Sequence, residues 1–88
     1  GFAQEAAEKY GVTSPEGVAL FSYMMNWGPA LAEKYFAAAK GTNDQSAKIQ
    51  AVLNAASQAG DSDAVGRINA TIGRANQLGL SSTASFNA

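Results

Sequence analysis

Cysteine and histidine are both absent from the sequence. Without cysteine the chain has no disulfide, no thiolate metal ligand and no thiol nucleophile. Without histidine it lacks the commonest general base and the commonest metal ligand, so a zinc site would need carboxylates alone. The composition therefore predicts a protein that is not an enzyme and holds no cofactor or metal. It leaves the cellular compartment open.

Charge is also scarce. Charged residues make up 15% of the chain, against about 25% in a typical soluble protein. Six Lys or Arg oppose seven Asp or Glu, and no basic stripe supports nucleic-acid binding. No apolar run reaches the ~20 residues of a membrane span, and no basic flank favours a membrane surface. Small uncharged residues fill the difference, which suits contact with other proteins.

The few carboxylates have structural explanations. Two of the seven, Glu8 and Glu33, have no predicted role, and two separated residues do not form an acid–base pair. The other five are placed to cap a helix or to pair with a basic residue one turn away: Glu5, Glu16, Asp44, Asp61 and Asp63. We therefore predict no catalytic residue.

Helical signals recur along the chain, and the period-two alternation of strands is missing. Each predicted helix is followed by a glycine suited to end it. Three pairs of opposite charge at i,i+4 are expected on these helices: Glu5–Lys9, Asp44–Lys48 and Asp63–Arg67. The predicted helices span residues 3–10, 15–40, 44–59 and 63–78.

The second of these helices contains Gly28-Pro29. Proline cannot donate a backbone hydrogen bond and crowds the preceding turn, so the helix is either kinked or broken there. An apolar stripe at helical spacing continues through the dipeptide and favours a kink: Leu20, Met24, Trp27, Leu31 and Tyr35. We expect an all-α bundle of four to five helices. Residues 1–80 would form one domain, followed by a polar tail at 81–88.

Residues 17–32 carry no charge and most of the large apolar side chains. One interpretation makes this segment the core helix of the bundle. The other makes part of it a partner surface, because a helix that is apolar nearly all round needs cover on two faces. The candidate contact residues are Phe21, Met24, Met25 and Trp27.

Two further features are candidates for contact. Gly66, Ala70 and Gly73 share a narrow strip of the last helix, away from its apolar seam of Val65, Ile68 and Ile72. Each glycine there costs about 1 kcal/mol relative to alanine, so we predict close approach of another backbone, with tolerated surface glycine as the alternative. In the tail, Phe86 is either part of a disordered end or a side chain that docks in a groove.

These features favour a non-enzymatic structural or interaction protein that assembles with copies of itself or with a larger assembly. Virion components, secreted filament subunits and scaffold modules share this composition. The alternative is a monomeric helical adaptor that binds a partner helix in a groove lined by Met24, Met25 and Trp27.

Overall fold

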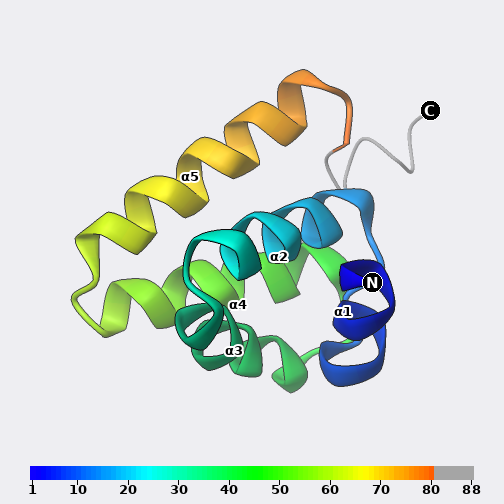
Figure 1. The fold of residues 1–88 in the computed structure, drawn as a ribbon, viewed down its shortest axis with the longest axis horizontal. Helices are drawn as coiled ribbons and strands as arrows, with labels where there is room; N and C mark the ends of the chain where they lie inside the picture. The colour runs from blue at the N-terminus through cyan, green and yellow to red at the C-terminus, as the bar shows by residue number, and fades with distance from the viewer. Residues whose placement is uncertain (81–88) are drawn as a thin grey trace.

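A computed structural model describes residues 1–80 of the chain as an all-α bundle, and this part contains no strand (Figure 1). The prediction of four to five helices is confirmed. The helices are α1 (Phe2–Tyr10), α2 (Pro15–Trp27), α3 (Pro29–Phe36), the 3-10 helix η1 (Ala37–Gly41), α4 (Gln45–Gln58) and α5 (Ser62–Gln77).

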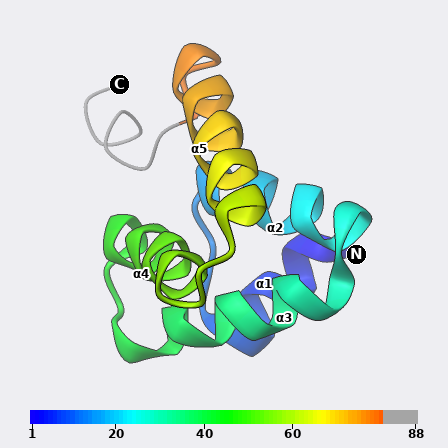
Figure 2. The same cartoon turned by 90° about the vertical axis from the view of Figure 1, so that its left-hand side faces the viewer.

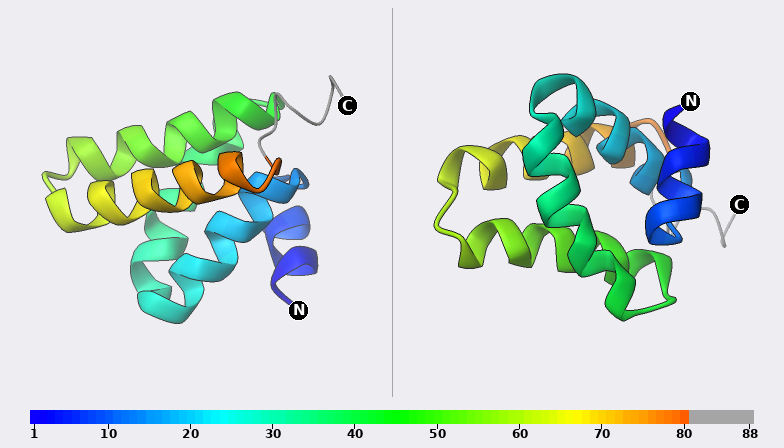
Figure 3. Two further views of the ribbon diagram at one scale, coloured as in Figure 1. Left: turned by 90° about the horizontal axis from the view of Figure 1, so that it is seen from above. Right: turned by 60° about the horizontal axis from the view of Figure 1, so that its bottom comes forward.

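α2 lies at the centre of the bundle and packs against α1, α3 and α5 (Figures 1 and 2). α4 and α5 form a helical hairpin whose turn contains Gly60, with a φ of 71° (Figure 3). The two helices separate away from this turn, and α2 also packs against α5 (Figure 1). Among the described residues, no helix is both long and apolar enough to cross a membrane.

Glycine and serine define the junction between α1 and α2. Gly11 adopts a left-handed conformation with a φ of 68°, and the Val12 N–H donates to the Ala6 carbonyl at 3.1 Å, which closes α1 as predicted. The Ser14 hydroxyl accepts from the Gly17 N–H at 3.1 Å, and Pro15 is the first residue of α2. Ser14 is therefore the N-cap of α2, which begins at residue 15 as predicted.

The long central helix is broken at Gly28, so the favoured prediction of a single kinked helix was wrong. Gly28 has φ −155° and ψ 83°, which is not helical, and its N–H still donates to the Met24 carbonyl at 2.7 Å. Pro29 starts α3, where its missing N–H costs nothing because first-turn amides have no intrahelical partner. The apolar stripe continues because both helices face the same core.

Lys48 does not pair with Asp44, which corrects a second prediction. The Asp44 carboxylate instead caps α4 and accepts from the Ala47 N–H at 2.8 Å. Lys48 is 4% exposed, and its Nζ donates to the Tyr10 and Ala39 carbonyls at 2.8 Å each. Carbonyls near a helix C-terminus lack intrahelical donors and attract a positive charge, so the buried amine joins the ends of α1 and η1 to α4.

The other two predicted charge pairs are confirmed. Lys9 Nζ lies 3.7 Å from Glu5 and Arg67 Nε lies 3.2 Å from Asp63. Glu33, which had no predicted role, lies 3.6 Å from Lys9 and links α3 to α1. These carboxylates have structural partners on exposed faces.

Aromatic rings form the core on one side of α2. The Phe21 ring centroid lies 6.1 Å from Phe2, 5.7 Å from Tyr10 and 5.0 Å from Phe36. Phe21 and its neighbour in the core, Met24, have 0% exposure. The rings that cover Phe21 belong to α1 and α3, and α3 packs against α2 after the break at Gly28.

Candidate interaction surface

The structure separates the predicted contact residues of α2 into two groups. Phe21 and Met24 are fully buried, so in this fold they present no surface to a partner. Met25 and Trp27 are half-buried and pack against the core. Because Met24 lies inside and Trp27 is covered by α5, the predicted groove of Met24, Met25 and Trp27 does not form.

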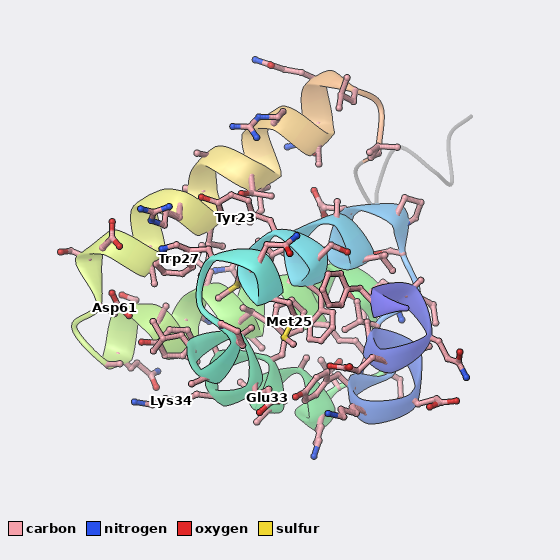
Figure 4. The ribbon with its side chains drawn as sticks, viewed as in Figure 1. Tyr23, Met25, Trp27, Glu33, Lys34 and Asp61 are labelled. Carbon is pink, nitrogen blue, oxygen red and sulfur yellow. The ribbon has the colours of Figure 1, made fainter. Side chains whose placement is uncertain are left out.

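Tyr23 and Trp27 lie on the side of α2 that faces α5 (Figure 4). Their rings stack with centroids 6.5 Å apart and an interplanar angle of 19°. The Arg67 guanidinium carbon lies 4.6 Å from the Trp27 ring centroid, and Arg67 NH1 donates to the Tyr23 hydroxyl at 3.0 Å. A cation over an aromatic face is attracted by the negative face of the ring. Arg67 thereby joins α5 to α2.

Two acceptors determine the electrostatics of Arg67. The Tyr23 hydroxyl and the Asp63 carboxylate both accept from its guanidinium, and together they raise its pKa above the usual value. The Asp63–Arg67 pair was predicted from the sequence, whereas the contact of Arg67 with Tyr23 and Trp27 was not. The ion pair joins residues one helical turn apart, a spacing that is visible in the sequence. Tyr23 and Arg67 are 44 residues apart on different helices, so their contact depends on the fold.

A shallow depression of about 350 Å³ lies between α2 and α5. A second depression of about 150 Å³ adjoins it, and the two share Tyr23, Thr71 and Arg74. We refer to them together as the α2–α5 groove. Asp63, Gly66, Arg67 and Ala70 line its first part, and Ala19, Ala75, Leu78 and Leu80 line its second.

The predicted strip of Gly66, Ala70 and Gly73, here called the α5 strip, lies on the solvent side of its helix. A Cβ added at Gly66 or Gly73 would meet no atom within 4 Å. The buried face of α5 is on the opposite side and consists of Ala64, Ile68, Thr71 and Ala75. Within residues 1–80, therefore, no helix approaches the strip. Gly66 and Ala70 also line the groove, so the strip and the groove are parts of one surface.

Charged and apolar side chains border this surface. The Asp63 side chain is 69% exposed near the start of α5, and Arg74 is exposed in its last turn. Arg74 has no ion pair with a carboxylate in the described part of the chain. Leu78, at the far end of the groove, is 68% exposed. Phe86, the remaining predicted contact residue, lies outside the described residues.

Asp61 forms a separate polar contact at the start of α5. Its carboxylate accepts from the Tyr35 hydroxyl at 2.7 Å and from the Ala64 N–H at 3.0 Å. These two hydrogen bonds lower the pKa of Asp61, and the same contact raises the pKa of Tyr35. The contact caps α5 and joins it to α3, so a structural role accounts for it. Over residues 1–80, no three carboxylates gather where they could hold a metal ion.

Comparison of the chain with protein-family models, with curated proteins and with solved structures finds no match. A function can therefore be inferred only from the residues and their arrangement.

Proposed function

We propose that this chain is a non-enzymatic interaction protein that assembles with copies of itself or docks into a larger assembly. The proposed contact surface is the α5 strip with the adjoining α2–α5 groove. Virion components, secreted filament subunits and scaffold modules are the classes whose low charge and abundance of small residues resemble this composition.

One observation carries the proposal. α5 contains two glycines on its solvent side, and an added Cβ at either would meet no atom within 4 Å. Each glycine costs about 1 kcal/mol relative to alanine inside a helix. No contact within residues 1–80 requires either position to lack a side chain. Glycine allows another backbone to approach closely. A contact with a second molecule would explain why both positions lack a side chain.

The groove beside the strip supports the same surface. It combines an aromatic ring and an arginine guanidinium, which are frequent at the centre of protein interfaces, with an exposed leucine that adds apolar surface. These are Tyr23, Arg67 and Leu78. The strip provides close approach, while the groove provides side chains that a partner can contact.

The test changes the bulk of one residue on the strip. Gly73→Leu should reduce the mass of the assembled species measured by light scattering, because the new side chain holds the partner away. Gly73→Ala should retain assembly and raise helix stability by up to about 1 kcal/mol. Gly41→Leu is the matched control, since Gly41 is also exposed with no atom within 4 Å of an added Cβ but lies on η1.

The proposal fails if Gly73→Leu assembles as well as the unmodified chain while its helix content by circular dichroism is unchanged. It also fails if Gly41→Leu reduces assembly to the same degree, because the effect would then come from any added surface leucine.

A further inference from the structure

The second part of the α2–α5 groove is a mostly apolar hollow beside the end of α5. Its volume of about 150 Å³ is close to that of an apolar cavity that binds benzene. Leu78 lies at its edge and is 68% exposed, although the other large apolar side chains of residues 1–80 are at least partly buried. The hollow therefore has the room and the lining for one phenyl ring, which would cover Leu78.

The end of α5 leads the chain to this hollow. Gly79 has a φ of 74°, and its N–H donates to the Asn76 carbonyl at 3.1 Å. The Leu80 N–H donates to the Ala75 carbonyl at 2.8 Å, which completes the hydrogen-bond pattern of a glycine helix stop. Leu80, the last residue that the structure describes, lines the hollow. The sequence that follows Leu80 therefore starts at the wall of the hollow.

That sequence contains one side chain suited to fill the hollow. Phe86 is the only large apolar residue of 81–88, and the five residues before it are small and uncharged. Six residues span at most about 20 Å, which is enough to bring Phe86 back to a hollow that Leu80 itself lines. We propose that Phe86 docks in the second part of the groove of its own chain, with its ring against Leu78 and Arg74.

Arg74 supports an aromatic occupant. It lines the hollow and forms no ion pair with a carboxylate in the described part of the chain. A guanidinium is attracted by the face of a phenyl ring, and the same helix already uses this contact where Arg67 lies 4.6 Å from the Trp27 ring centroid. A ring in the hollow would give Arg74 an equivalent partner.

The short connection to Leu80 favours the chain's own tail over a separate molecule. A side chain joined to its groove by a few residues has an effective concentration of about millimolar order there. A tail from another molecule would need a similar concentration to compete. The inference does not rest on the proposed function, because the occupant belongs to the same chain, and the α5 strip and the first part of the groove stay available to a partner.

Nuclear magnetic resonance of the unmodified 88-residue chain tests the docking. At about 0.1 mM, below the effective concentration of the tail, nuclear Overhauser cross-peaks should join the Phe86 ring protons to the Leu78 methyls. The ring should also shift these methyl signals upfield. Phe86→Ala should abolish that shift, whereas Ser82→Ala, a matched change in the tail, should leave it in place. Circular dichroism establishes that both variants are folded.

Leu78 methyl signals that do not move in folded Phe86→Ala overturn the proposal, as does a lack of cross-peaks in the unmodified chain. Cross-peaks that join a labelled chain to an unlabelled one would assign the ring to a second copy, and they also overturn docking within one chain. None of these results depends on the mass of the chain in solution, so failure of this inference and failure of self-assembly are separate outcomes.

Discussion

The two sides of α2 are covered in different ways. On one side, Phe21 contacts the rings of Phe2, Tyr10 and Phe36, and its exposure is 0%. On the other side, Tyr23 and Trp27 both contact Arg67 of α5 and remain half-buried. The first side is closed by apolar rings from α1 and α3. On the second, α5 contributes the small and apolar residues of its buried face together with the polar side chain of Arg67, and a groove remains beside it.

The two sides of α2 are therefore expected to have different roles, one in the stability of the fold and the other in association. The Phe21 side has no surface to offer, so its residues contribute to folding alone. The α5 side includes a polar contact through Arg67 and exposes glycine, arginine and leucine along one face. Substitutions on the first side should therefore affect the free energy of unfolding most, and substitutions on the second should mainly affect association.

The largest expected effect is at the centre of the aromatic core. Phe21→Ala should lower the free energy of unfolding by about 3–5 kcal/mol, because it leaves a cavity among three other rings. Tyr23→Phe, on the α5 side, removes one hydrogen bond to a partly exposed arginine and should cost less than about 1 kcal/mol. Urea unfolding measures both, and equal losses would contradict the contrast between the two sides.

An intermediate effect is expected at the buried lysine. Lys48→Met keeps the apolar stem but leaves the Tyr10 and Ala39 carbonyls without their donor, which should cost about 2–4 kcal/mol. Lys40→Met, at an exposed lysine of η1 whose amine lies 5.7 Å from the Tyr10 ring centroid, should lower the free energy of unfolding by less than about 1 kcal/mol. If the two variants unfold at the same urea concentration, the amine does not stabilise the junction of α1, η1 and α4.

The smallest effect concerns pH. The lowered pKa of Asp61 means that the unfolded chain takes up a proton there more readily than the folded one. This contribution to stability is present above the unfolded pKa of about 3.9 and is lost as the pH falls through the folded value.

Asp61→Asn keeps a residue that caps helices well, so it should stay folded at neutral pH and lose stability less steeply in acid. Tyr35→Phe removes the main cause of the pKa shift and should flatten the same slope. Unfolding measured from pH 6 to pH 2 provides the comparison. An acid slope that neither variant changes would exclude this contact as its source.

Local signals in the sequence predicted much of this fold. Gly11, Ser14 and Pro15 act on their own turns, so the end of α1 and the start of α2 were correctly placed. The position of Gly28 was also visible, but its conformation depends on how α3 packs against α2. Periodicity alone could not distinguish a kink from a break, because both keep the stripe on the core side.

The surface was predicted in part. The α5 strip was visible because two glycines inside a helix are costly wherever the helix lies. The burial of Phe21 was not predictable, because it depends on rings of α1 and α3 that cover one side of α2. The role of Lys48 was missed for a similar reason, since its acceptors lie 38 and 9 residues away along the chain.

The central claim is that the exposed face of α5 is a self-association surface. Its most direct test is the mass of the unmodified chain in solution over a wide range of concentration. The account predicts a species of at least twice the 9.0 kDa chain mass, which dissociates on dilution and does not form with Gly73→Leu. A mass of 9.0 kDa at every concentration would contradict the claim.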